Sequence, residues 1–100
     1  MAKIINSEEF ENIIAGDKPV MVDFYADWCG PCRMVAPTIE ALSAERDDAV
    51  IVKVNVDNTP ELAVRFGVSS IPTILVFRGG ELFSRAVGVR SKDELIEMLG

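Results

Sequence analysis

The sequence predicts an α/β fold in which helices cover both faces of a central mixed β-sheet. Segments with helical and strand character alternate along most of the chain, which is typical of parallel strands joined by crossover helices. Near the C-terminal end, two apolar segments are separated only by Gly79-Gly80, and this is a strong hairpin signal. About half of the 100 residues (49%) are hydrophobic, which is enough for one core, so we expect a single domain over residues 1–100.

The first three elements are predicted from end signals and from apolar runs. Lys3–Ile5 is expected to form a short strand. Ser7 is the expected N-cap of a helix, with acidic residues in its first turn and Gly16 as its stop. Pro19–Tyr25 is an almost continuous apolar run, as expected of a central strand that is buried on both faces.

The middle of the chain is predicted to hold a long helix, a strand and a short helix. The long helix runs from about Cys29 to Arg46, and Pro37 inside it removes one backbone hydrogen bond and should kink it. Val50–Val56 has valines at every second position and is expected to be a strand. Pro60–Phe66 is expected to be a short helix that Gly67 closes.

The last elements are a hairpin and a helix. The strands Thr73–Arg78 and Glu81–Val87 flank the two glycines of the turn. Ser91 and Glu94 form a capping box that opens the final helix. The predicted order is therefore βαβαβαββα.

Both cysteines of the chain lie in one motif, Cys29-Gly30-Pro31-Cys32, directly after the expected central strand. Residues i and i+3 are neighbours on a helix, so the thiols can close a disulfide with little backbone movement. A structural disulfide is one alternative, but so small a ring would stabilise the fold by only about 2 kcal/mol. A zinc site is another, but structural zinc takes four Cys or His ligands, and the chain has two cysteines and no histidine. We therefore favour a redox pair at a strand-to-helix junction.

Position within the motif distinguishes the two thiols. Cys29 is expected at the helix N-terminus, where unpaired N–H groups and the helix dipole favour a thiolate nucleophile. Cys32 lies one turn further along and more buried, where it can resolve a mixed disulfide by attacking Cys29. Pro31 suits the first helical turn, and Gly30 leaves room for a partner to approach. Trp28 could be plain core, but beside an exposed nucleophile we favour a contact surface.

Asp23 is the one carboxylate in the apolar strand, where a buried charge is unfavourable. One interpretation is a side chain at a strand end that local hydrogen bonds satisfy. The other, which we favour, is a buried acid/base under the active-site helix, because no histidine can take the proton when Cys32 attacks. Lys53 alternates with Val52 and Val54, and on this pattern alone it is expected to be solvated.

The motif and its surroundings resemble the thioredoxin family. The matching segments fall in the family's order from about Ile4 to Leu99: Asp23-Phe24-Tyr25-Ala26, Trp28-Cys29-Gly30-Pro31-Cys32, Arg33-Met34-Val35-Ala36-Pro37, Lys53-Val54-Asn55-Val56-Asp57, Gly67-Val68, Ile71-Pro72-Thr73, Phe77, Gly79-Gly80 and Val87-Gly88. The combination of Trp-Cys-Gly-Pro-Cys with a downstream Ile-Pro-Thr is very specific for this family. One departure is Tyr25, where many relatives carry a second tryptophan.

The resemblance implies a thioredoxin fold and a dithiol–disulfide oxidoreductase that reduces disulfides in other proteins. Cys29 would attack the substrate disulfide, and Cys32 would then displace the reduced product. The resemblance gives Asp23 the same buried acid/base role and places Lys53 near it. It also implies that the Ile71–Pro72 bond is cis and packs against the disulfide, whereas an X–Pro bond taken alone is expected to be trans.

A substrate-binding surface is expected around Cys29. Pro72 has no N–H and cannot pair as an inner strand residue, whereas Ile71 keeps backbone groups that could bind an extended substrate strand. Gly88 would let a substrate backbone come close. The expected apolar patch consists of Trp28, Ile71, Val87 and Gly88.

Composition argues against several other classes of protein. The formal net charge is −6 and no Lys/Arg cluster stands out, so nucleic acid is not an expected ligand. The longest apolar runs fall far short of the roughly 20 residues that span a bilayer. Because residues 1–6 contain no signal-peptide hydrophobic region, we expect the protein in the cytoplasm, a reducing compartment. We also expect it to be a monomer.

No bound cofactor or metal is expected. By resemblance, a separate thioredoxin reductase, a flavoprotein that uses NADPH, would restore the dithiol. Two rival functions stay open. An oxidant or isomerase would share the motif, but the Gly-Pro pair between the cysteines is that of the reducing members of the family. A structural subunit of a larger assembly would not need its cysteines.

Overall fold

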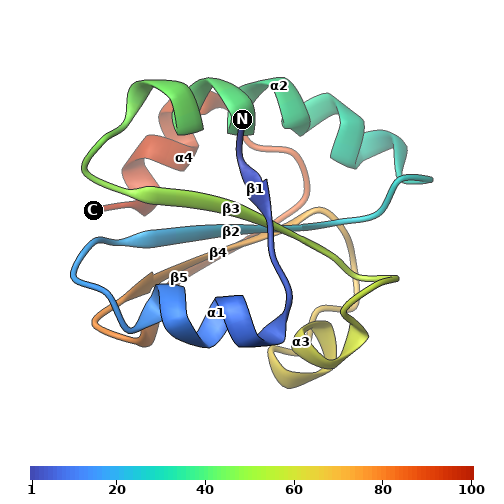
Figure 1. Cartoon of the computed structure of the whole chain (residues 1–100). Helices are drawn as coiled ribbons and strands as arrows, with labels where there is room; N and C mark the ends of the chain where they lie inside the picture. The colour runs from blue at the N-terminus through green and yellow to red at the C-terminus, as the bar shows by residue number, and fades with distance from the viewer.

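The computed structural model describes residues 1–100 and contains five strands and four helices in the predicted order (Figure 1). The strands are β1 (Lys3–Ile4), β2 (Val20–Tyr25), β3 (Val50–Asn55), β4 (Thr73–Arg78) and β5 (Glu81–Val87). The helices are α1 (Ser7–Ile14), α2 (Gly30–Glu45), α3 (Pro60–Arg65) and α4 (Lys92–Met98). The predicted α/β class is confirmed, and most element boundaries agree closely with the sequence prediction.

The strands form one mixed sheet in the order β1-β3-β2-β4-β5. β1 and β2 run parallel to β3, whereas β4 runs antiparallel to β2 and to β5. The central strand β2 is buried along its whole length, as its apolar sequence predicts. Because β2 and β3 are parallel, the segments that follow them leave the sheet at the same end. The start of β4 and the end of β5 lie at that end too, since Thr73 pairs with both Phe24 and Val87.

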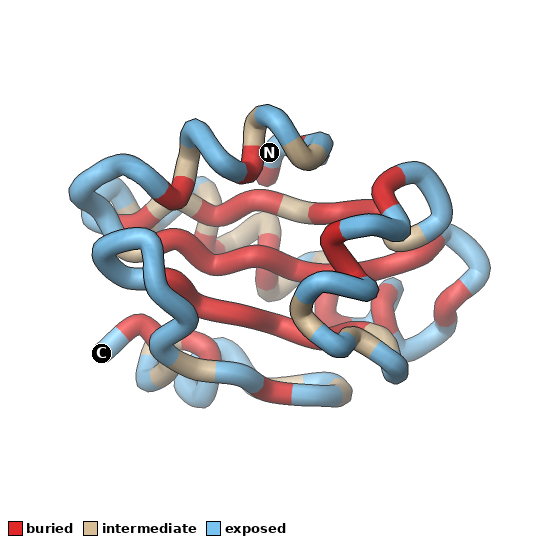
Figure 2. The backbone as a smooth tube through the Cα atoms, turned by 90° about the horizontal axis from the view of Figure 1, so that it is seen from below, coloured by how far each residue is buried: buried red, intermediate tan, exposed pale blue.

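Helices cover both faces of the sheet, α2 and α4 on one and α1 and α3 on the other (Figure 1). Each face has its own core cluster. The three inner strands β2, β3 and β4 are mostly buried, whereas the edge strands β1 and β5 and the outer surfaces of the helices are largely exposed (Figure 2). The core under α1 and α3 includes a triangle of edge-to-face rings formed by Phe10, Phe66 and Phe77. The core under α2 and α4 is built mainly from Met21, Val35, Ile39, Leu42, Ile74 and Leu95.

The start of α1 corrects one prediction. Asn6, not Ser7, is the N-cap: its side chain accepts a hydrogen bond from the backbone N–H of Glu9 at 2.9 Å, and the Glu9 carboxylate accepts one from Asn6. Asn and Ser are about equally good N-caps, so adjacent candidates can be separated only by their backbone geometry. The capping box predicted at Ser91 is confirmed.

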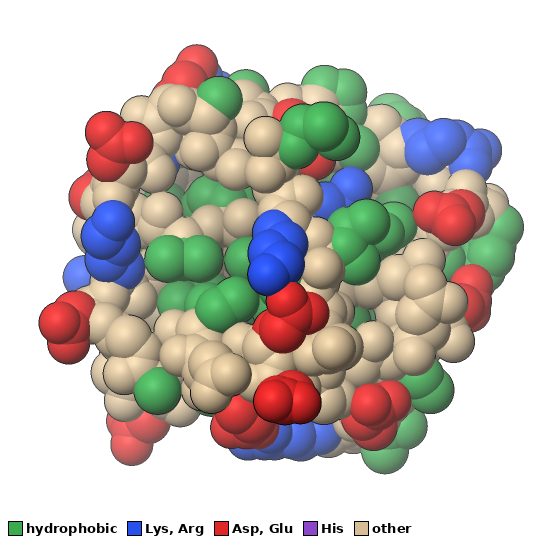
Figure 3. Space-filling view, in the orientation of Figure 1, with side chains coloured by type: hydrophobic (Ala, Val, Ile, Leu, Met, Phe, Trp, Pro, Cys, Tyr) green, Lys and Arg blue, Asp and Glu red, His purple; other side chains and the backbone are tan.

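The surface mixes both signs of charge. On the face viewed in Figure 3, basic side chains lie among acidic ones and form no continuous basic area. None of the helices combines the length and the apolar character that crossing a membrane requires.

Candidate active site

The cysteine motif lies where four segments converge at one end of the sheet. The motif itself joins β2 to α2, residues 56–57 follow β3, residues 71–72 precede β4, and residues 87–88 end β5. This convergence follows from the strand directions, because β2 and β3 end at this edge and β4 begins there. Residues that are far apart in the sequence therefore meet around the two sulfurs.

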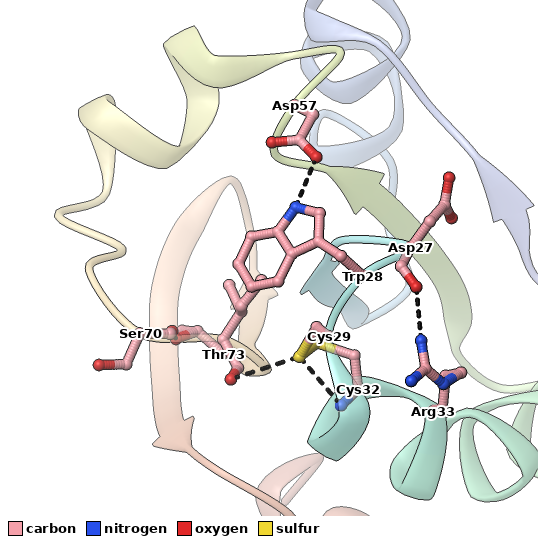
Figure 4. Close-up of a disulfide and its surroundings, with 9 residues drawn as sticks. Asp27, Trp28, Cys29, Cys32, Arg33, Asp57, Ser70 and Thr73 are labelled. Atoms are coloured by element: carbon pink, nitrogen blue, oxygen red, sulfur yellow. Dashed lines mark hydrogen bonds between the residues drawn. A yellow bond between two sulfur atoms is a disulfide. The ribbon is translucent and has the colours of Figure 1, made fainter.

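Cys29 and Cys32 form a disulfide whose Cα atoms are 5.2 Å apart. Cys29 is the N-cap of α2, and its sulfur accepts a hydrogen bond from the backbone N–H of Cys32 at 3.1 Å (Figure 4). Pro31 lies in the first turn of α2, where its missing N–H costs nothing. The Cys32 N–H and the positive end of the helix dipole therefore lie at the sulfur that would carry negative charge in the reduced protein.

One expectation about these thiols is not met in the disulfide form. Cys29 was expected to be exposed and Cys32 more buried, yet Cys29 is 4% exposed and Cys32 is 3% exposed. Both pack in a small apolar cluster with Tyr25 and Ala26, against which Val56 and Ile71 also lie. Burial therefore does not separate the two sulfurs in this state, whereas their positions on the helix do.

Trp28 is part of the surface and not of the core, since it is 68% exposed. Its indole N–H donates a hydrogen bond to the Asp57 carboxylate at 2.9 Å, which fixes the ring beside Cys29 (Figure 4). Asp57 was not singled out from the sequence as a site residue. The contact joins the segments after β2 and β3, and only the parallel pairing of these strands brings them together.

The Ile71–Pro72 peptide bond is cis, as the resemblance implies. The carbonyl oxygen of Ile71 lies 3.7 Å from the sulfur of Cys29. Gly88 donates its backbone N–H to the carbonyl of Pro72 at 2.8 Å, which ties the end of the hairpin to the same segment. Val87 beside it is exposed. Of these residues, Ile71 packs against the cluster that holds the disulfide, and Gly88 is connected to it through Pro72.

Asp23 lies in the middle of the sheet with only 1% of its surface exposed, and neither carboxylate oxygen has a hydrogen-bond partner. The interpretation of a side chain satisfied by local hydrogen bonds is therefore wrong. Burial raises the pKa of Asp23 to about 7, against the opposing effect of Lys53 and with a smaller contribution from Glu40 in the same direction as burial. The site thus contains a carboxyl group that can exchange a proton near neutral pH.

Lys53 pairs with Asp23 across β3 and β2, which confirms that the two residues are neighbours. The prediction of a solvated side chain is wrong, because only 14% of the Lys53 side chain is exposed. Its ammonium lies 3.9 Å from a Glu40 oxygen and 4.4 Å above the centre of the Tyr25 ring. Alternation in β3 does not indicate solvent here, since helices cover both faces of the sheet.

Comparison with known proteins identifies the family. The thioredoxin family model matches residues 1–100. The thioredoxin of Chlamydia caviae is 44% identical over 99% of this chain and 96% of its own length. The bifunctional thioredoxin reductase/thioredoxin of Mycobacterium leprae is 42% identical over 97% of this chain, which covers 21% of that longer protein.

A solved structure of a mutant thioredoxin from Halobacterium salinarum has a TM-score of 0.91 to this chain at 36% identity, over 98% of this chain and 87% of that one. Its likeness confirms that the predicted fold is the thioredoxin fold. Together with the disulfide at the start of α2, these full-length matches show that the chain belongs to the thioredoxin family of dithiol–disulfide oxidoreductases.

Proposed function

We propose that the protein works as a protein-disulfide reductase with Cys29 as the nucleophile. In the dithiol form, the Cys29 thiolate attacks one sulfur of a substrate disulfide, and the other substrate sulfur leaves as a thiolate. The Cys32 thiolate then attacks the Cys29 sulfur, which releases the second substrate thiol and closes the Cys29–Cys32 disulfide. Two electrons pass to the substrate, so the protein acts as an electron carrier between a reductant and its substrates.

The observation that carries this assignment is the position of Cys29 as the N-cap of α2, with the Cys32 N–H donating to its sulfur. This hydrogen bond and the helix dipole both stabilise a thiolate on Cys29 and give no such support to Cys32. Asp23 is the proposed proton acceptor when Cys32 attacks, because its pKa is raised to about 7 and its oxygens have no other partner. Lys53 is proposed to assist by its positive charge beside Asp23.

The proposed substrate surface surrounds Cys29. Its exposed aromatic is Trp28, held in place by Asp57, and Ile71 offers backbone groups to an extended substrate strand. A Cβ added at Gly30 would meet no other atom within 4 Å, so a partner could approach closely there. The full set is Trp28, Gly30, Pro31, Ile71, Pro72, Val87 and Gly88.

The oxidised protein must be reduced again to act more than once. We propose a separate NADPH-dependent flavoprotein, a thioredoxin reductase, as that partner, and the fused reductase in the Mycobacterium leprae relative supports the pairing. We also propose that residues 1–100 act as one monomeric domain. A cytoplasmic location is proposed because a disulfide reductase needs a compartment that keeps its dithiol reduced.

Reduction of insulin disulfides by dithiothreitol, with and without the protein, tests this function. The wild type should accelerate the reaction, and Cys29→Ser and Cys32→Ser should not. A measured reduction potential as oxidising as that of a disulfide-forming enzyme would favour the oxidant or isomerase instead. Full biological function of the double Cys→Ser variant would indicate a structural subunit.

A further inference from the structure

A cluster of three charged side chains lies under the active-site helix, and the proposed chemistry uses only two of them. Asp23 comes from β2, Lys53 from β3 and Glu40 from α2. Neither the sequence pattern nor the resemblance gave Glu40 a role. Its contacts show how the three side chains divide their interactions.

Glu40 uses both of its carboxylate oxygens. One accepts a hydrogen bond from the backbone N–H of Ala2 at 2.6 Å, and the other lies 3.9 Å from the Lys53 ammonium. Ala2 is buried beside α2, so its N–H holds the Glu40 carboxylate in one orientation. The Tyr25 ring lies against the same ammonium, 4.4 Å from its centre. A carboxylate and an aromatic face therefore hold the Lys53 charge.

Asp23 does not share in this arrangement, although it lies directly opposite Lys53 in the register of the sheet. Neither of its oxygens receives a hydrogen bond, and the salt bridge of Lys53 is with Glu40. A lysine beside an unpartnered buried carboxylate would normally pair with it. The pairing with Glu40 explains why Lys53 does not.

We propose that Glu40 is a positioning residue for disulfide reduction: by holding the Lys53 ammonium, it leaves Asp23 without a salt-bridge partner and able to take up a proton. The inference deepens the proposed function, since it rests on Asp23 being the proton acceptor. Glu40 does not touch the sulfurs or the substrate, and it acts only through Lys53 and through its own charge.

Few other groups around Asp23 can titrate or carry charge. β3 supplies Lys53, α2 supplies Glu40 and the Cys32 thiol of the reduced protein, and β2 supplies Tyr25. The β4 residue opposite Asp23 is the apolar Ile74. Of the two charged side chains, Lys53 lowers the pKa of Asp23 and Glu40 raises it. Removing the Glu40 charge and releasing the Lys53 ammonium toward Asp23 should therefore both lower the pKa of Asp23.

The test is the pKa of the Asp23 carboxyl in full-length Glu40→Gln, followed by the ¹³C chemical shift during a pH titration. We expect the pKa to fall by about 1 unit, the lower end of what a neighbouring charge produces. Glu45→Gln is the matched control: Glu45 is on the same helix and its carboxylate pairs with Lys92, so the same loss of charge should leave the Asp23 titration unchanged.

A double variant separates the effect of Glu40 that acts through Lys53 from the direct effect of its own charge on Asp23. In a Lys53→Gln background the pKa of Asp23 should be higher than in the wild type, and adding Glu40→Gln should lower it less than it does in the wild type. An equal decrease in both backgrounds would overturn the positioning role, as would an Asp23 titration in Glu40→Gln that matches the wild type.

The pH profile of single-turnover insulin reduction gives a functional readout. Its acidic limb should move to lower pH in Glu40→Gln by the same amount as the Asp23 pKa, and it should not move in Glu45→Gln. A limb that stays in place while the pKa moves would overturn the link to catalysis. The proposed function fails separately, if the wild type does not reduce insulin at all.

Discussion

Replacing Asp23 with asparagine should stabilise the protein at alkaline pH and leave its stability almost unchanged at acidic pH. Burial raises the pKa of Asp23 from 3.8 to about 7 in the folded state. Between these values the folded protein holds a proton that the unfolded chain has lost, so the free energy of unfolding falls as pH rises through this range. Above the folded-state pKa the whole cost of the buried charge is present.

The size of the effect follows from the shift. A difference of about 3 pKa units corresponds to about 4 kcal/mol at 1.36 kcal/mol per unit. The asparagine amide is neutral at every pH and avoids this cost, although it is buried without partners as the protonated acid is. We therefore expect Asp23→Asn to be more stable than the wild type by roughly 2–4 kcal/mol at pH 8 and by little at pH 4.

Urea denaturation of both oxidised proteins at pH 4 and pH 8, read by circular dichroism, measures these differences. The stability of the wild type relative to the variant should fall between the two pH values. Carboxyls whose pKa is lowered by folding, such as Glu9, Glu61 and Glu94, are common to both proteins and cancel in this difference. In parallel, Asp23→Asn should slow the step in which Cys32 attacks, because the proton acceptor is gone. An Asp23→Asn protein that is less stable than the wild type at pH 8 would refute the reasoning.

Three further predictions concern the surface around the sulfurs. Iodoacetamide should label Cys29 of the reduced protein much faster than Cys32 near neutral pH, and equal labelling rates would contradict the assignment of the nucleophile. Cys32→Ser should trap mixed disulfides with substrate, whereas Cys29→Ser should not. Trp28→Ala should raise the KM for insulin with little change in unfolding free energy, because the ring is mostly exposed; a large loss of stability would place it in the core. Gly88→Ala should cost about 1 kcal/mol in thermal unfolding, because φ is +93° there, and unchanged stability would mean that the backbone relaxes.

The fold could be predicted from the sequence because its signals are local. The apolar run of β2, the glycine pair between β4 and β5 and the capping box at Ser91 each report on a few adjacent residues. The error at the start of α1 has the same origin. Asn6 and Ser7 are adjacent and chemically similar, and the backbone geometry that separates them depends on how the chain leaves β1.

The site could be predicted only where one residue type carries the chemistry. Two cysteines at helical spacing and a carboxylate in an apolar strand are informative by themselves, and both Cys29 and Asp23 were found in this way. Asp57 and Glu40 were not, because each contacts a side chain that is distant in the sequence: Asp57 contacts Trp28, and Glu40 contacts Lys53. Neither pairing has a signature that a single sequence can show.

The role of Lys53 is the hardest to predict from the sequence, since it depends on which carboxylate the lysine pairs with. A lysine in full contact with Asp23 would keep that group ionised and make it a poor proton acceptor near neutral pH. A fold without Lys53 would leave Asp23 still harder to ionise. Asp23 would then be mostly protonated near neutral pH and less able to accept the proton of the attacking thiol. The observed position lies between these cases: the lysine is a neighbour of Asp23 in the sheet, but its ammonium is held by Glu40 and Tyr25. The pKa of the buried Asp23 is thus close to the pH at which the thiols would exchange protons. On the proposed function, the loss of stability that this carboxylate causes is the cost of its role as proton acceptor.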